Sequence, residues 1–171
     1  MTEQGFTSSV PGIYEGLLAL VREAAEEQPK PVSVLPFELA QYEPSRYVIV
    51  GPIKGPHYEW ESIPMQMREV YDICGKATVF TGSGGTTETT ATKVLSETFA
   101  LLLNCVWTPA LANRDYPTFG LKETTVQIML PLEAKYDAGL DVIAGQPGGW
   151  GGVIEWGIHF EVVLNPTPAL R

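Results

Sequence analysis

Apolar and polar residues alternate over the last long segment of the chain. The intervening positions are mostly small or polar and include Glu155, His159 and Glu161. A period of two is typical of a β-strand with one buried face. The pattern predicts a strand over residues 150–164, and because the usual strand has about 5–6 residues, one this long is expected to project beyond its own core and to need a partner. The positions that share the apolar register are Trp150, Gly152, Ile154, Trp156, Ile158, Phe160 and Val162.

Two other stretches have the three- and four-residue spacing of amphipathic helices. The first predicts a helix over residues 11–28, with Pro11 in its first turn and Pro29 after its end. The second predicts a helix over residues 87–107, which Pro109 ends. The apolar stripes consist of Ile13, Leu17, Leu20, Val21 and Ala24 in the first helix and of Ala91, Leu95, Phe99, Leu102 and Val106 in the second.

Shorter apolar or alternating runs predict the remaining strands. These runs lie over residues 32–35, 46–50, 68–80 and 121–132. Glycine–proline pairs within residues 51–56 predict a turn between two of them. The order of elements predicts a single α+β domain over residues 1–171, in which a mostly antiparallel sheet carries two main helices packed on one face.

A glycine-rich loop, TGSGGTTETT at residues 81–90, stands between a predicted strand and a predicted helix, as phosphate-binding loops do. A P-loop that began at Gly82 would need glycine and lysine where the chain has Thr87 and Glu88. The third glycine of a dinucleotide-binding loop is missing as well. Glu88 also places a negative charge at the helix start, where a phosphate would bind. We therefore interpret Gly82–Gly85 as a turn, in which glycines adopt positive φ.

Other catalytic or metal-binding patterns are absent from the sequence. Neither of the two histidines, His57 and His159, lies within two to five residues of a cysteine or of the other histidine, so the short His/Cys ligand pairs of a zinc site are absent. No G-x-S-x-G nucleophile elbow occurs. Glu59 and Glu61 stand two residues apart on one face of the weakly alternating HYEWESI segment, where a solvated or inter-subunit surface is favoured over an acidic site. We predict no catalytic, cofactor-binding or metal-binding residue, and no enzyme activity.

Composition narrows the possible partners. The chain has 11 basic and 20 acidic residues, a net charge of −9, and no basic run. Binding to nucleic acid by phosphate neutralisation needs clustered lysine and arginine, so it is not expected. No apolar run approaches the roughly 18–20 residues of a membrane helix, so no membrane partner is expected.

The order of motifs resembles a family of viral proteins. A short N-terminal helix and a proline-spaced stretch precede YVIVGPIKGPHYEWESI, which is followed by a strand that starts with Arg68, Glu69 and Tyr71. A glycine turn, a long helix and a long terminal strand complete the order. From about Pro11 to Asn165 this resembles the tail terminator proteins of long-tailed (siphovirus-type) bacteriophages, small α+β subunits that cap the head-proximal end of the tail tube.

The resemblance implies a structural protein of the virion tail, assembled in the host cytoplasm. It implies a homohexameric ring that stops tube polymerisation, contacts the tail tube protein and the head–tail connector or neck proteins, and leaves a channel through which DNA passes without specific binding. A ring needs two different patches on each subunit. Candidate contacts are the last strand, residues 112–120 and residues 133–149. Candidate interface residues are Glu59, Glu61, Tyr116, Trp150, Trp156 and His159.

Some alternatives stay open at this point. Trp150 and Trp156 fit a core as well as an interface, whereas Trp60 and Trp107 fit a core or the end of an element. The chain could be a neck or tube subunit rather than a terminator. It could also be a binding module that adds a peptide strand to its sheet edge, or a small enzyme that uses the Gly82–Gly85 loop.

Overall fold

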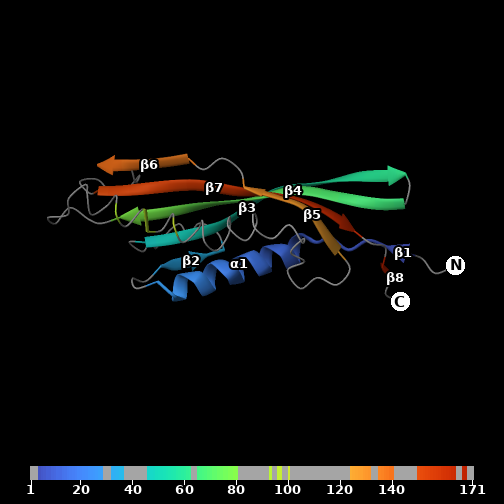
Figure 1. Ribbon diagram of the computed structural model, residues 1–171, viewed down its shortest axis with the longest axis horizontal. Helices are drawn as coiled ribbons and strands as arrows, with labels where there is room; N and C mark the ends of the chain where they lie inside the picture. The colour runs from blue at the N-terminus through green and yellow to red at the C-terminus, as the bar shows by residue number, and fades with distance from the viewer. Residues whose placement is uncertain are drawn as a thin grey trace.

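A computed structural model places one helix, α1 (Val10–Glu26), against one face of a six-stranded sheet (Figure 1). The two-residue strands β1 (Gln4–Gly5) and β8 (Thr167–Pro168) pair with each other outside that sheet. The strands of the sheet are β2 (Ser33–Leu35), β3 (Arg46–Ser62), β4 (Met65–Phe80), β5 (Thr124–Pro131), β6 (Lys135–Leu140) and β7 (Trp150–Leu164). The residues that the structure describes are 4–28, 32–36, 46–62, 65–80, 93, 96–97, 100, 124–131, 135–140, 150–164 and 167–168.

The sheet is mixed. Its order is β2-β3-β4-β7-β5, with β6 also paired to β7. β2 runs parallel to β3, while the other neighbours are antiparallel. The predicted fold class, a mostly antiparallel sheet with two main helices on one face, is therefore wrong. The apolar period shows which face of a strand is buried and does not show in which direction its neighbour runs.

α1 is the one helix whose bounds the structure describes, although residues 93, 96–97 and 100 are also helical. α1 occupies the place of the helix predicted over 11–28. Its buried face is centred on Ile13, Leu17 and Val21, while Leu20 is 36% exposed. The helix predicted over 87–107 lies outside the described residues, apart from 93, 96–97 and 100.

The hydrophobic core lies between α1 and the inward face of β3, β4 and β7. Tyr71 and Phe160 stack there with ring centroids 5.4 Å apart. Gly75 pairs with Trp156 across β4 and β7, and a Cβ atom on Gly75 would lie 2.2 Å from the indole ring. Glycine at this position therefore lets the indole pack directly on the backbone of β4. The remaining inward side chains are Val48, Val50, Ile73, Ala77, Val79, Ile154, Ile158, Val162 and Leu164.

A tyrosine fixes the N-terminal part of α1 against the edge of the sheet. The Tyr14 hydroxyl lies 2.7 Å from the carbonyl oxygens of both Pro36 and Val50. Because the hydroxyl carries one proton, it donates to one carbonyl at a time. Burial raises the pKa of Tyr14, and nearby Arg22 lowers it by a smaller amount. The neutral hydroxyl thus ties α1 to β3 and to the segment that follows β2.

The long last strand is central in the sheet. β4 pairs with β7 along residues 151–164. On the opposite edge, β5 pairs with residues 158–164 and β6 with residues 150–155. The expectation that this strand projects and needs a partner is wrong, because its partners belong to the same chain. β6 also lies within residues 133–149, which we expected to serve as a contact segment.

The glycine–proline segment is not a turn. β3 runs without interruption from Arg46 to Ser62, and its pairing with β4 shifts register between Val50 and Ile53 and again between Lys54 and His57. Gly51 and Gly55 have φ of 130° and 105°. Positive-φ glycine serves a bulge in a strand as well as a turn, so the sequence signal is the same for both.

Candidate interaction surface

A buried glutamate joins the start of α1 to the sheet. Glu69 lies on the inward face of β4, two residues before Tyr71 and on the same side of the strand, and is 0% exposed. Its carboxylate accepts hydrogen bonds from Ser8 Oγ at 2.6 Å, Ser9 N at 2.8 Å and Ser9 Oγ at 2.5 Å. Ser9 Oγ also lies 3.1 Å from the Tyr71 hydroxyl. Buried charges are tolerated where such donors satisfy them.

The same carboxylate replaces the usual side-chain cap of the helix. Ser9 is the N-cap residue of α1, and its own hydroxyl makes no capping hydrogen bond to the helix backbone. Glu69 instead accepts from the Ser9 N–H and places its negative charge at the positive end of the helix dipole. Burial raises the pKa of Tyr71, with the Ser9 hydrogen bond opposing and the Glu69 charge adding to the increase. The cluster fixes the position of α1 over β4, and its tyrosine stays neutral.

Beside this cluster, β3 is exposed. Every side chain from Lys54 to Trp60 is exposed, whereas residues 69–71 of β4, which lie beside this part of β3, are buried. Tyr58 is 49% and Trp60 62% exposed. Phe6 packs edge-on against the Trp60 ring, with the centroids 5.5 Å apart. Large aromatic side chains exposed in this way are typical of interaction surfaces.

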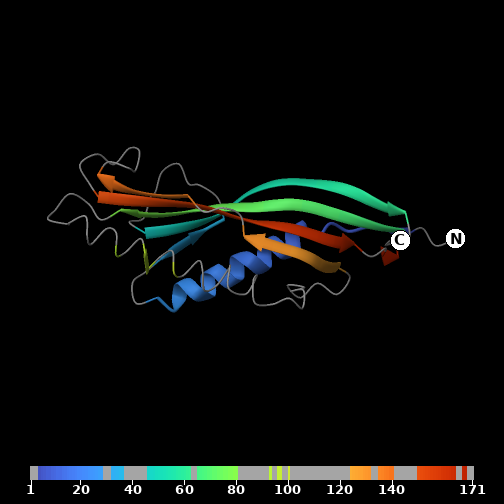
Figure 2. The ribbon, with the colours of Figure 1, turned by 45° about the horizontal axis from the view of Figure 1, so that its top comes forward.

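The outer edge of this strand has no neighbour among the described residues. β2 pairs only with residues 47–49 of β3. From His57 to Ser62 the pairing of β3 with β4 is regular, without a bulge. We call residues 57–62 the outer edge strand. The β3–β4 hairpin that contains it reaches the end of the molecule where β1 and β8 also lie (Figures 1 and 2).

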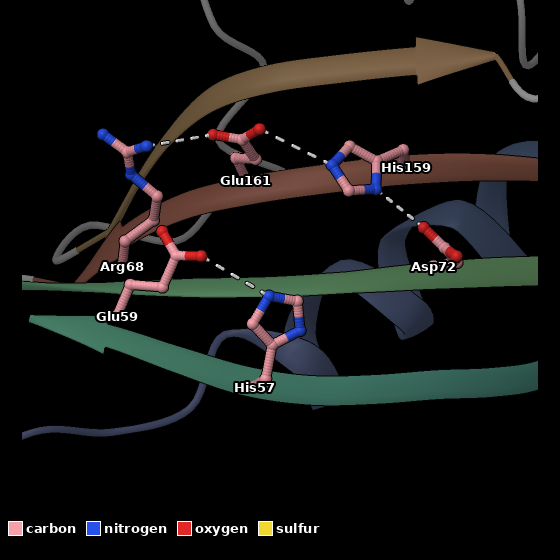
Figure 3. A network of polar contacts seen from close by, with 6 residues as sticks. All are labelled: His57, Glu59, Arg68, Asp72, His159 and Glu161. Carbon is pink, nitrogen blue, oxygen red and sulfur yellow. Dashed lines mark hydrogen bonds and ion pairs between the residues drawn. The ribbon is translucent and has the colours of Figure 1, made fainter.

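The face of the sheet that points away from α1 carries a polar network (Figure 3). His159 Nδ1 lies 2.7 Å from Asp72 Oδ1, its cross-strand neighbour, and His159 Nε2 lies 3.6 Å from Glu161 Oε1. Arg68 donates to Glu161 at 3.3 Å. These side chains are 21–31% exposed, so water screens their charges in part. The imidazole is held between two carboxylates, which suits a role in joining β4 to β7.

The structure separates the predicted interface residues. Glu59 is exposed on the outer edge strand, 3.6 Å from His57, and the backbone of Glu61 belongs to the same strand. His159 is part of the polar network, and Trp156 lies in the core with 4% exposure. Trp150 is placed by its backbone at the start of β7. Tyr116 lies outside the described residues, as does the Gly82–Gly85 loop.

Sequence reasoning missed the role of Glu69 and the exposure of Trp60. Ser8 or Ser9 was expected to cap the first helix, and Ser9 is its N-cap residue, although without a side-chain hydrogen bond to the helix backbone. Glu69 had a signal, because the alternation of Met67, Glu69, Tyr71 and Ile73 places a carboxylate in an otherwise apolar register. The serines that meet it are 60 or 61 residues away, and no local pattern connects them. Trp60, expected in a core or at the end of an element, is exposed because the inward face of β3 continues beyond the start of α1.

Two features bear on the enzyme alternative. Among the described residues, no group of three or more His, Cys, Asp or Glu side chains is placed to hold a metal ion. A pocket of about 450 Å³ lies beside the end of α1 and β2, and its lining includes Arg22, Glu26, Gln28 and Ser33. Arg22 and Glu26 are exposed. The described lining therefore has no desolvated charged pair of the kind that active sites use.

No helix in the part of the chain that the structure describes is long and apolar enough to cross a membrane.

Comparison with known proteins assigns no family. No protein-family model matches the chain, and no curated protein matches it.

Proposed function

We propose that this chain is a structural assembly subunit that acts through docking rather than catalysis. In its most specific form, the proposal is a ring-forming tail terminator of a long-tailed bacteriophage, which caps the tail tube and joins it to the head connector. The observation that carries it is the pair of exposed aromatic residues, Tyr58 and Trp60, on a hairpin that the rest of the fold holds rigidly.

Rigidity matters because an assembly surface must be in place before its partner arrives. Residues 67–70 of β4 pair with β3 on one side and with β7 on the other. The Glu69 cluster fixes α1 against the same stretch. Side chains on such a scaffold lose little conformational freedom on docking, which favours affinity. Tyrosine and tryptophan are the residues whose truncation most often weakens an interface by 2 kcal/mol or more.

The charge of the chain is compatible with the proposed channel. A net charge of −9 discourages the sticking of DNA phosphates to a wall along which DNA must slide. The alternation of exposed aromatic and acidic residues on β3 also suits contact with a protein better than contact with nucleic acid. The proposed partners are further copies of this chain, the tail tube protein and the head–tail connector or neck proteins.

Electron microscopy of the purified protein, alone and mixed with the tail tube protein, tests this proposal. Single rings, or rings at the ends of tubes, are the expected result. Long tubes formed by this chain alone would indicate a tube subunit instead. Isolated particles in both samples would contradict the proposal.

A matched pair of variants connects the outcome to the surface. The double substitution Tyr58→Ser/Trp60→Ser removes the exposed aromatic rings and is expected to abolish rings. Leu20→Ser on α1 removes the other large exposed hydrophobic side chain among the described residues and should leave rings unchanged. Equal loss of rings in both variants would contradict a specific role for the hairpin.

A further inference from the structure

We propose that the outer edge strand, residues 57–62, accepts an extended segment of a different protein by strand addition, and that the added segment alternates basic and apolar residues. The inference rests on the proposed function only in treating this hairpin as an assembly surface. It requires neither a ring nor a particular virus. It names the chemistry of the partner that this edge fits.

The backbone limits where a strand can be added. In an antiparallel pair, every second residue directs its N–H and C=O groups away from the neighbour, so three of the six residues 57–62 offer both groups outward. The preceding part of β3 contains Pro52 and Pro56 and two shifts of register. Prolines and bulges are the usual means by which proteins block edge pairing. The edge is thus blocked up to residue 56 and regular after it.

The two faces of the outer edge strand determine the side chains of the added segment. Tyr58 and Trp60 lie on one face, opposite Glu69 and Met67 of β4. His57 and Glu59 lie on the other, with side chains 65% and 55% exposed, and the backbone position of Glu61 shares their alternation. An added strand meets these faces at alternate positions. Apolar residues fit the aromatic face, and lysine or arginine fits the acidic one.

The same charges argue against a second copy of this strand as the occupant. Pairing of two outer edge strands would bring together Glu59 and Glu61 from each copy. Like charges on adjacent strands destabilise the pair. The chain, with 20 acidic against 11 basic residues, has no basic run to serve as the added strand, so contacts between copies would use the aromatic side chains of the hairpin rather than this edge. A basic segment of another protein provides both the hydrogen bonds and the opposite charge.

Peptide binding, measured by fluorescence anisotropy with the full chain, tests the proposal. The probe is a labelled eight-residue peptide of alternating lysine and valine. We expect saturable binding that weakens as salt rises, because the charge pairs are exposed. A Lys–Pro peptide of equal charge cannot form the ladder and should bind at least tenfold more weakly. A Glu–Val peptide should not bind.

Two variants locate the site. Glu59→Lys/Glu61→Lys should weaken binding of the Lys–Val peptide by about tenfold. The matched control Glu15→Lys/Glu23→Lys reverses two exposed charges on α1 and should change binding less than twofold. Amide hydrogen exchange should show new protection by the peptide within residues 57–62. These expectations together support strand addition at this edge.

Several results would overturn the inference. Equal binding of the Lys–Val and Lys–Pro peptides would show simple charge attraction. Equal loss in the two charge-reversed variants would show that the site is elsewhere, and no binding at millimolar peptide would remove the inference altogether. The result of the peptide-binding experiment is independent of whether the chain forms rings. Rings without peptide binding leave the proposed function standing, and peptide binding without rings leaves only the strand-addition site.

Discussion

Replacement of Glu69 by alanine is the sharpest test of how the hairpin is held. The substitution removes the acceptor of hydrogen bonds from Ser8 Oγ, Ser9 N and Ser9 Oγ. Ser8 is exposed, so water replaces its lost partner. Ser9 is 1% exposed, so its two donors lose their acceptor inside the protein. Its hydroxyl retains the Tyr71 oxygen at 3.1 Å, whereas its backbone N–H has no such substitute.

The magnitude follows from these contacts. An unsatisfied buried donor costs about 1–3 kcal/mol, and loss of a helix cap typically costs about 1 kcal/mol. Because the Ser9 hydroxyl is partly rescued, we expect Glu69→Ala to lower the free energy of unfolding by about 2–4 kcal/mol. For a chain of this size each kcal/mol corresponds to about 2–4 °C, so Tm should fall by roughly 4–16 °C.

Urea unfolding monitored by circular dichroism measures the loss, with two further variants for comparison. Glu69→Gln keeps one carbonyl acceptor and the side-chain shape, so it should lower the free energy of unfolding by less than Glu69→Ala does. Glu59→Ala removes a half-exposed glutamate from the same hairpin and should stay within about 0.5 kcal/mol of the wild type. If Glu69→Ala is as mild as Glu59→Ala, the carboxylate does not hold α1 to the sheet and our reasoning is refuted.

Three other predictions concern different parts of the fold. Burial raises the pKa of Tyr71 above its usual value of 10.0, so the contribution of Tyr71 to stability should be constant below about pH 10 and be lost as pH rises above it. Because the pKa of Tyr14 is raised as well, Tyr71→Phe should reduce the alkaline loss in pH-dependent unfolding without abolishing it, and an unchanged slope would contradict the prediction. Gly75→Ala places a Cβ atom 2.2 Å from the Trp156 ring and 2.5 Å from the Ile49 carbonyl oxygen. Thermal unfolding should therefore show that the free energy of unfolding falls by at least about 1–3 kcal/mol, and near-wild-type stability would contradict this by showing that the indole can move. The ion pair of Arg68 and Glu161, 29% and 21% exposed, should give a coupling energy of about 1 kcal/mol or less in a double-mutant cycle, and a value above 2 kcal/mol would mean that it is effectively desolvated.

The elements with a strong, continuous period could be predicted from the sequence. The spacing of Ile13, Leu17 and Val21 indicated α1, and the alternation along residues 150–164 indicated β7 with its buried face. Each pattern reflects one face of one element packing on a core, which is local information. The number of strands that flank β7 depends on segments far away in the chain, so its central position could not be read in the same way.

The strand at β2 was predicted but its parallel direction was not, and residues 51–56 were wrongly predicted to form a turn; both have a related cause. Ser33–Leu35 has too few residues to show more than its tendency to be extended, and its parallel direction depends on the path of the chain after α1. At Gly51 and Gly55 the sequence correctly marks positive φ, but a bulge and a turn need the same residues. The segment forms bulges because β4 pairs with β3 on both sides of each of them.

The candidate site was only partly accessible to sequence reasoning. Glu59 and Glu61 were singled out, and they lie on the outer edge strand. The exposure of Tyr58 and Trp60 depends on where α1 begins relative to β3, which is a tertiary fact. Glu69 interrupts a series of alternating apolar residues. This pattern indicates that a charge is buried there, but it does not indicate which residues bind that charge.

The mass of the assembled particle tests the central claim most directly. Light scattering after size-exclusion chromatography should give the wild-type chain the mass of six copies of 18.7 kDa each. The Leu20→Ser control should give the same mass, and the Tyr58→Ser/Trp60→Ser chain should elute as a folded monomer. A wild-type monomer at every concentration, both alone and with the tail tube protein, would contradict assembly into a ring. An unchanged assembly in the doubly substituted chain would contradict a role of this hairpin in that assembly.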